Sequence, residues 1–112
     1  MTSTRQHKVS RLLQKELGDY FQKQGPAILP GKMITVTVVR ISPDLGLAKV
    51  YLSLFPGDKH KEDIKVIEDR AGSVRSEMGR RLGKQLKHIP EFVFYLDDSL
   101  DYIDHIEELL NE

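Results

Sequence analysis

Two runs of strand-forming residues, joined by a short turn, constrain the fold of this chain more than any other feature. Residues 33–41 read MITVTVVRI and residues 48–54 read AKVYLSL, and both are dense in the β-branched side chains that favour strands. The connection begins with SPDLG at residues 42–46, in which Pro fixes φ, Asp can bond to its own backbone and Gly permits a positive φ. These features predict an antiparallel hairpin. The apolar side chains expected to be buried against helices are Ile34, Val36, Val38, Val50, Leu52 and Leu54.

Apolar residues at helical spacing predict helices on both sides of this hairpin. Before it, one apolar stripe runs along residues 4–24 and is interrupted by Gly-Pro, so that residues 25–32 are expected to form a loop. After it, with Asp58 as the N-cap, a second stripe extends from Ile64 to Leu86. Glycines interrupt this stripe, and each costs about 1 kcal/mol relative to Ala in a helix interior. We therefore expect the second helix to bend or break near Gly72.

The remaining segment completes a small α+β domain. Pro90 ends the helical pattern, and residues 91–96, EFVFYL, have the composition of a third strand. A short final helix is expected to begin after a cap at Asp98 or Ser99. The most economical packing is a three-stranded sheet with helices on one face. We expect one domain over residues 1–98, followed by an acidic C-terminal helix or tail over residues 99–112.

Composition excludes several functional classes. The chain has no cysteine, so disulfides, thiolate metal sites and cysteine nucleophiles are excluded. Its four histidines lie in separate segments, and no glycine-rich loop has the spacing of a phosphate cradle, so catalysis, a metal site and a bound cofactor have little support. No apolar run approaches the roughly 20 residues that span a bilayer, and no secretory signal is visible. We expect a cytoplasmic protein that does not contact membranes.

The net charge of zero hides a segregation of charge along the chain. Residues 1–88 carry all 17 Lys and Arg with 9 acids, a net charge of +8, whereas residues 89–112 carry 8 acids and neither Lys nor Arg. Such a chain has one part that can meet an anion and another that repels it. The alternative is that the two parts neutralise each other on one surface.

Two basic clusters are the candidate binding residues. The first lies on one polar face of the first helix, and the second lies around the expected break, where a helix start would offer free N–H groups to a phosphate. No aromatic residue interleaves with them, so phosphate contacts rather than base stacking are expected. A solvated helix face is the alternative, and Arg75, beside the apolar stripe, could instead brace the fold. The residues predicted to bind a polyanion, and RNA if the resemblance described next holds, are Arg5, Lys8, Arg11, Lys15, Arg70, Gly72, Arg75, Arg80, Arg81 and Lys84.

Several ordered motifs resemble the ribosome-binding factor A family. They are VRISPDL and AKVYLS in the hairpin, GSVRSEMGRRL from residue 72, PEF with DDSL around the third strand, and IEELL near the end. The resemblance covers nearly the whole chain and implies a type II KH-like fold, in which a kinked helix replaces the usual GxxG loop. The family's kink is usually Ala-x-Gly, whereas Arg70-Ala71-Gly72 stands here. Gly72 would supply the flexible position and Arg70 an additional phosphate contact.

The resemblance also implies a function. Members of this family are not enzymes; they bind the small (30S) ribosomal subunit and its 16S rRNA, promote late rRNA maturation and support growth in the cold. We therefore expect a monomeric RNA-binding assembly factor that could act with other assembly factors. The alternative is a protein–protein interaction module that docks through the hairpin edge or the acidic tail. That tail could limit unspecific RNA binding or fold back as a competing anion.

Overall fold

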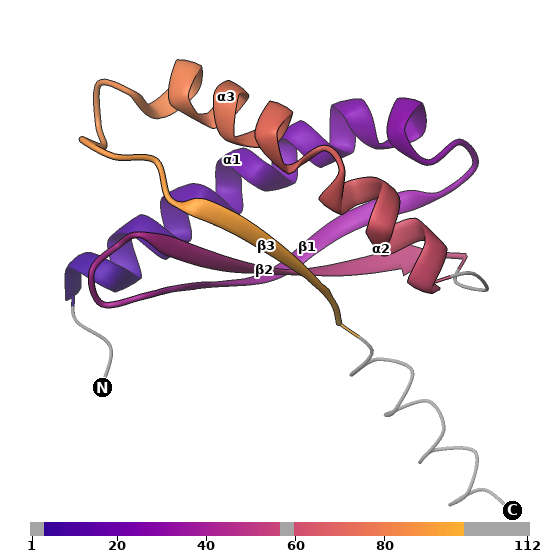
Figure 1. Cartoon of the computed structure of the whole chain (residues 1–112), viewed down its shortest axis with the longest axis horizontal. Helices are drawn as coiled ribbons and strands as arrows, with labels where there is room; N and C mark the ends of the chain where they lie inside the picture. Colours follow the sequence, from indigo (N-terminus) through magenta and orange to yellow (C-terminus); the bar gives the residue numbers. More distant parts are fainter. Residues whose placement is uncertain (1–3, 57–59, 98–112) are drawn as a thin grey trace, which may run out of the picture.

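The computed structural model describes residues 4–56 and 60–97 as a single layer of sheet covered by helices on one face (Figure 1). The element order is α1 (Thr4–Ile28), β1 (Met33–Ile41), β2 (Leu47–Phe55), α2 (His60–Glu68), α3 (Ala71–Leu82) and β3 (Glu91–Leu96). This order confirms the predicted α+β fold, the three strands and the broken second helix. The expected cap at Asp58, the final helix and the 99–112 tail lie outside the described residues.

The sheet has the order β1-β2-β3, with β1 antiparallel and β3 parallel to β2. The predicted hairpin is therefore confirmed, but a bulge shifts its register: Val36 pairs with Leu52, whereas Val38 pairs with Tyr51. A bulge moves the following residues to the opposite faces of the strand. Consequently Val39 and Ile41 are buried, and the expectation that Val38 is buried was wrong, since it is 37% exposed.

Helix α1 continues through the Gly25-Pro26 pair, which was expected to end it. Glycine tolerates the helical conformation before proline because it has no Cβ to clash with the proline ring. The Leu29 N–H donates to the Gly25 carbonyl at 2.8 Å, and Ile28 and Leu29 are buried. The last turn of α1 packs near the start of β1. The free energy gained by burying it therefore outweighs the hydrogen bond that is lost because proline has no backbone N–H.

The break between α2 and α3 lies at residues 69–70, two residues before the predicted position. The Arg70 N–H donates to the Ile67 carbonyl at 2.9 Å, and the Arg70 carbonyl accepts the first bond of α3 from Val74. Ile67 and Val74 are both fully buried. The break thus lets two differently directed helices bury one continuous apolar stripe. Leu86, the last predicted member of that stripe, lies beyond α3 and is half-buried.

The turn between β1 and β2 places the positive φ at Leu45 (62°), not at Gly46 as predicted. The Asp44 carboxylate accepts hydrogen bonds from the Ser42 hydroxyl at 2.6 Å and from the Gly46 N–H at 3.0 Å. These donors lower the pKa of Asp44 below its usual value, the Ser42 hydroxyl having the larger effect. Asp44 therefore organises the turn.

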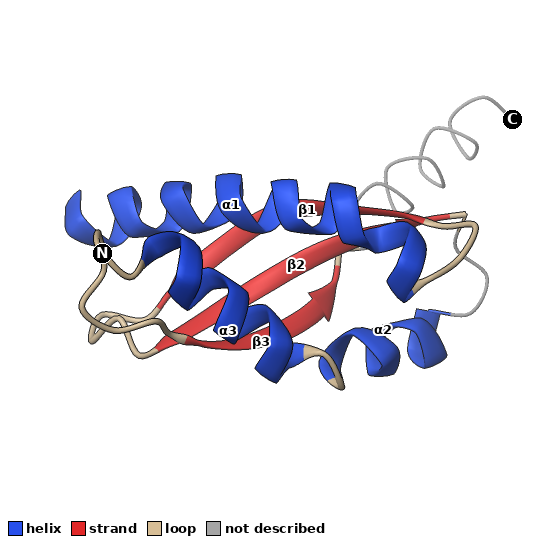
Figure 2. Ribbon diagram, turned by 90° about the horizontal axis from the view of Figure 1, so that it is seen from above, coloured by secondary structure: helices blue, strands red, loops and turns tan. Residues whose placement is uncertain are grey.

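The core lies between the sheet and the helices (Figure 2). Phe21 of α1 meets Phe94 of β3 edge to face, with ring centroids 5.8 Å apart, and both rings are almost completely buried. No helix among the described residues is long and apolar enough to cross a membrane. Within residues 4–56 and 60–97, no group of His, Asp and Glu side chains could hold a metal ion.

Candidate nucleic-acid interface

Four basic side chains of α1 form an exposed row on the face opposite its buried stripe. Val9, Leu13 and Leu17 are buried, so the residues between them project to solvent. All four basic side chains are exposed, and no described acid forms an ion pair with any of them. The members of this row, called here the α1 basic row, are Arg5, Lys8, Arg11 and Lys15. Their charges are available to an external anion.

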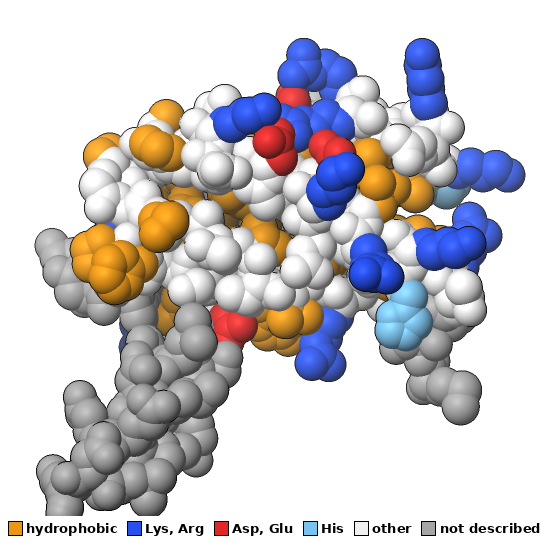
Figure 3. Space-filling model, turned by 180° about the vertical axis from the view of Figure 1, so that it is seen from behind, with side chains coloured by type: hydrophobic (Ala, Val, Ile, Leu, Met, Phe, Trp, Pro, Cys, Tyr) orange, Lys and Arg blue, Asp and Glu red, His pale blue; other side chains and the backbone are white. Residues whose placement is uncertain are grey.

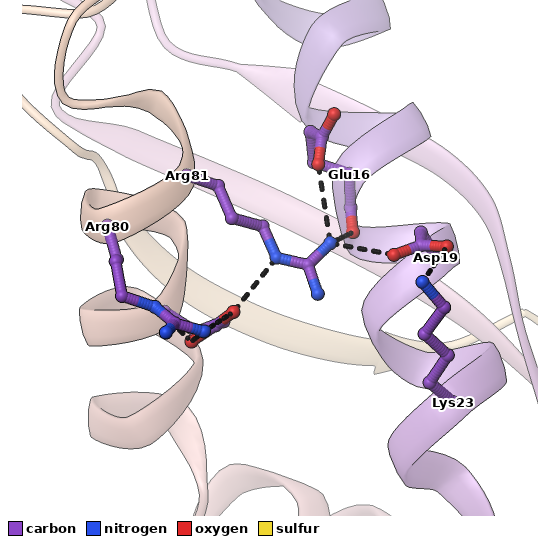
Figure 4. A network of polar contacts seen from close by, with 6 residues as sticks. Glu16, Asp19, Lys23, Arg80 and Arg81 are labelled. Carbon is purple, nitrogen blue, oxygen red and sulfur yellow. Dashed lines mark hydrogen bonds and ion pairs between the residues drawn. The ribbon is translucent and has the colours of Figure 1, made fainter.

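Arg81, another predicted site residue, is engaged inside the fold (Figure 4). From α3 its Nη1 donates to Asp19 Oδ2 at 2.8 Å and to Glu16 Oε2 at 3.3 Å, both on α1, while its Nε donates to Glu77 Oε1 at 3.0 Å. Only 23% of its side chain is exposed. These three carboxylates raise the pKa of Arg81 further above its usual value, with Glu77 contributing most. Arg81 therefore joins α3 to α1.

Glu16 and Asp19 were missed by reasoning from sequence as partners of the second basic cluster. The signal that could have found them is that they lie three apart on α1, a spacing that puts both on one helix face. The pKa of Asp19 is lowered by its hydrogen bonds, first from Arg81 and then from Lys23. Two acids on one face of an otherwise basic helix indicate the side that packs against a basic residue of another element, here Arg81 of α3.

Arg80 and Arg75 also have partners, but on the surface. Arg80 Nη2 donates to Glu77 Oε1 at 2.7 Å, with 78% of the Arg80 side chain exposed. An ion pair this exposed contributes little to stability and can give way to a phosphate. Arg75 donates from Nε and Nη2 to the Ile89 carbonyl at 3.2 and 3.1 Å. This contact ties α3 to the segment before β3, in line with the bracing role considered for Arg75.

The predicted site residues do not form one cluster. The first half of α1, the β1–β2 turn and the end of α3 share one end of the molecule, whereas Arg70 and Gly72 lie at the other end of α3 (Figures 1 and 2). Lys84 follows α3 and is exposed. In Figure 3 Lys and Arg side chains gather over one end and the adjoining side, and apolar side chains gather at the opposite end. The structure thus separates a basic end from the helix break.

Gly72 lies near the start of α3 with no requirement for glycine in the structure. Its φ is not positive, and a Cβ built there would meet nothing within 4 Å. Gly72→Ala is therefore expected to raise the free energy of unfolding by about 0.5–1 kcal/mol, because alanine favours the helix and restricts the unfolded chain. Thermal melting measures this effect. A variant that melts higher but binds RNA less well would show that an RNA backbone approaches Gly72 closely; a lower melting temperature would contradict the helix argument.

The outer face of the sheet, away from the helices, carries a feature that the sequence did not reveal. Tyr51 and Tyr95 are paired in register on β2 and β3, and their rings stack with centroids 5.4 Å apart. Arg40 and Lys49 pair in the neighbouring row of β1 and β2. Aromatic and basic side chains therefore adjoin on this face: Lys49 and Tyr51 lie two residues apart on β2, and β3 adds Tyr95 beside them.

Comparison with known proteins identifies the relatives of this fold. A family model described as ribosome-binding factor A matches residues 5–110. The ribosome-binding factor A of Cytophaga hutchinsonii is 41% identical over 112 residues, an alignment that covers all of this chain and 84% of that protein.

Solved structures show the same fold at lower sequence identity. The crystal structure of ribosome-binding factor A from Thermus thermophilus has a TM-score of 0.67 at 18% identity, covering 81% of this chain and 94% of that one. A homology model of the Thermus thermophilus factor, fitted into a cryo-EM map of its complex with 30S, has a TM-score of 0.56 at 17% identity, covering 78% of this chain and 93% of that one. These likenesses support the KH-like α+β arrangement. Because the family model spans nearly the whole chain and a relative is 41% identical along its full length, this protein belongs to the ribosome-binding factor A family.

Proposed function

We propose that this protein is a non-enzymatic assembly factor that binds the small (30S) ribosomal subunit and its 16S rRNA and promotes late maturation of that rRNA. The observation that carries the proposal is the α1 basic row, four exposed cations without a described acidic partner. Family membership supports the choice of the ribosome, since the Thermus thermophilus relative was fitted into a map of a 30S complex. We further propose that the protein acts as a monomer in the cytoplasm.

The exposed cations would hold rRNA phosphates and so fix the position of the protein. These are the α1 basic row together with Arg70, Arg80 and Lys84, while Arg75 and Arg81 would act mainly by keeping α3 in place. Phosphate contacts carry affinity but no direct sequence information. Maturation is promoted if the protein binds one rRNA conformation more tightly than its competitors, because a ligand shifts an equilibrium only through differential affinity.

The affinity of this protein for small subunits is expected to fall steeply with salt. Each neutralised phosphate adds roughly 0.7–0.9 to the slope of log affinity against log salt, so four contacts give a slope of about 3. Sedimentation of the full chain with purified subunits between low and moderate salt measures the slope. An affinity that is independent of salt would rule out the phosphate mechanism.

A protein partner is a second candidate because apolar side chains are exposed at the end opposite the basic row. Met33 of β1 and Phe55 of β2 pair in register and are 63% and 68% exposed. They border a groove of about 990 Å³ beside the free edge of β1 and the last turns of α1. Binding to the subunit that persists after ribonuclease treatment and in high salt would favour this protein-docking function over RNA binding.

A further inference from the structure

A second groove, at the basic end of the molecule, has a composition that suits a nucleotide. It has a volume of about 790 Å³, within the range of roughly 300–1,000 Å³ typical of pockets for small ligands. Its walls come from three separate segments: the first half of α1, the β1–β2 turn and residues 85–90 before β3. The segments that form these walls lie at the end of α3 away from the helix break (Figures 1 and 2). This second groove is called here the turn groove.

The floor of the turn groove is aliphatic. Leu12 of α1, Leu45 of the turn and Leu86 each line it, and each is half-buried against the core. Such a side chain is firmly seated yet leaves part of its surface for a ligand. An aliphatic surface of this kind can cover one face of a nucleobase, because removing that apolar face from water is favourable.

The rim of the turn groove is cationic. Arg5 and Lys8 reach it from α1, and Lys87 and His88 reach it from the segment before β3. All four are exposed, and none has an ion pair among the described residues. The acid of the lining, Asp44, accepts hydrogen bonds within its turn but keeps its negative charge, and the three cations Arg5, Lys8 and Lys87 outnumber it. The rim is therefore complementary to a phosphate.

Hydrogen bonds hold the walls of the turn groove in place before any ligand arrives. The β1–β2 turn is fixed by Leu47 N–H donating to Ser42 Oγ at 3.0 Å, and it is joined to β3 by Glu91 N–H donating to the Gly46 carbonyl at 3.0 Å. Arg75 anchors the opposite wall through the Ile89 carbonyl. Leu45 itself is held at a φ of 62°, which leucine rarely adopts. A preorganised groove costs a ligand little ordering entropy.

From this geometry we infer that the turn groove binds a nucleotide of single-stranded RNA, with the base on the aliphatic floor and the phosphate on the rim. The inference rests on the proposed function and adds base contact to it. An RNA strand is favoured over an acidic peptide because the rim is continuous with Arg11 and Lys15, so that the α1 basic row extends the phosphate contacts by about 10 Å beyond Lys8. Duplex RNA presents no free base to the groove, so the groove selects single strands.

The test compares three RNA probes bound to the full chain: a single-stranded decamer, its duplex, and the same decamer with abasic nucleotides throughout. The wild-type protein is expected to bind the single-stranded decamer about five- to tenfold more tightly than either of the others in fluorescence anisotropy. The double variant Leu12→Ser, Leu86→Ser is expected to lose this preference while keeping the salt dependence. Val66→Ser, which changes an exposed apolar residue of α2, is the matched control and should keep the preference.

The outcomes separate this inference from the proposed function. Equal, salt-dependent binding of all three probes by the wild-type protein would overturn the inference that the turn groove binds a base, while leaving the phosphate mechanism intact. This comparison uses only the wild-type protein, so it does not depend on whether a variant folds. Failure to bind any RNA would overturn both. Displacement of the decamer from the wild-type protein by a synthetic peptide of residues 98–112, but not from the double variant, would assign the groove to an acidic peptide instead.

Discussion

Neutralising the α1 basic row will reduce the affinity of this protein for the small ribosomal subunit by about 10²–10³-fold at 0.1 M salt. The variant replaces Arg5, Lys8, Arg11 and Lys15 with Gln. Four phosphate contacts contribute a salt slope of about 3, and each unit of slope is worth about tenfold between 1 M and 0.1 M salt. The loss should shrink as salt rises, and the slope should fall by about 3. Glutamine forms helices well, and the row has no ion pairs to lose among described residues, so α1 should stay folded.

The control is a second variant that has the same net charge as the first but loses four cations from other parts of the surface. Arg40, Lys49, Lys61 and Lys65 are all exposed and lie outside the α1 basic row: Arg40 and Lys49 are beside the β1–β2 turn on the outer face of the sheet, and Lys61 and Lys65 are on α2. Changing these four to Gln should reduce affinity much less, because none of them belongs to the row and charges on other faces of the molecule are screened over about 10 Å at 0.1 M salt. An equal loss in both variants would mean that binding follows overall charge, and would refute the assignment of the interface to α1.

The local elements of this fold could be predicted because their causes are local. The hairpin follows from β-branched runs around a Ser-Pro-Asp turn, and the strand at residues 91–96 begins and ends where its composition indicates. What could not be predicted depends on contacts across the chain. The length of α1 past Pro26 follows from burial of Ile28 and Leu29, and the exposure of Val38 follows from a bulge. Both effects depend on packing or pairing with other segments, so neither can be predicted from the residues of the helix end or of the strand alone.

The candidate site divides in the same way. Basic residues at helical spacing identified the α1 basic row correctly as one exposed face, since amphipathic periodicity is a property of one helix. For the second cluster, sequence could not separate exposed cations from engaged ones. Arg81 and Lys84 are three residues apart, yet only Arg81 meets Glu16 and Asp19, because α1 and α3 pack together there. The turn groove was missed because its three walls are far apart in sequence.

Replacing Arg81 with Met is expected to lower the free energy of unfolding by about 2 kcal/mol and the melting temperature by about 5–10 °C. Met keeps the unbranched stem of Arg but donates no hydrogen bond. The change leaves three carboxylates, those of Glu16, Asp19 and Glu77, without the cation that they share between α1 and α3. Calorimetric melting measures the loss. Arg80→Met removes an exposed charge beside the same Glu77 and should lower the melting temperature much less.

The pH dependence of this difference tests its cause. The carboxyl groups of Asp19 and Glu77 have ordinary pKa values of 3.8 and 4.5, and both are lowered in the folded protein, Asp19 chiefly by Arg81 and Glu77 by Arg80 and then Arg81. A carboxyl whose pKa is lowered by folding stabilises the protein above its unfolded pKa, and this contribution disappears as the pH falls through the folded pKa. The stability difference between the wild-type protein and Arg81→Met should therefore be largest above about pH 5 and shrink on acidification.

A difference in stability that stays constant from pH 7 to pH 3 would mean that Arg81 stabilises the fold through packing of its stem, not through its charge. Subunit binding distinguishes the remaining possibility. If Arg81 acts only by joining the two helices, Arg81→Met should bind small subunits nearly as well as the wild-type protein at a temperature where both are folded, and with the same salt slope. A folded variant whose slope falls by about 0.7–0.9 would instead place the Arg81 guanidinium on a phosphate, which requires that it leave Glu16 and Asp19 on binding.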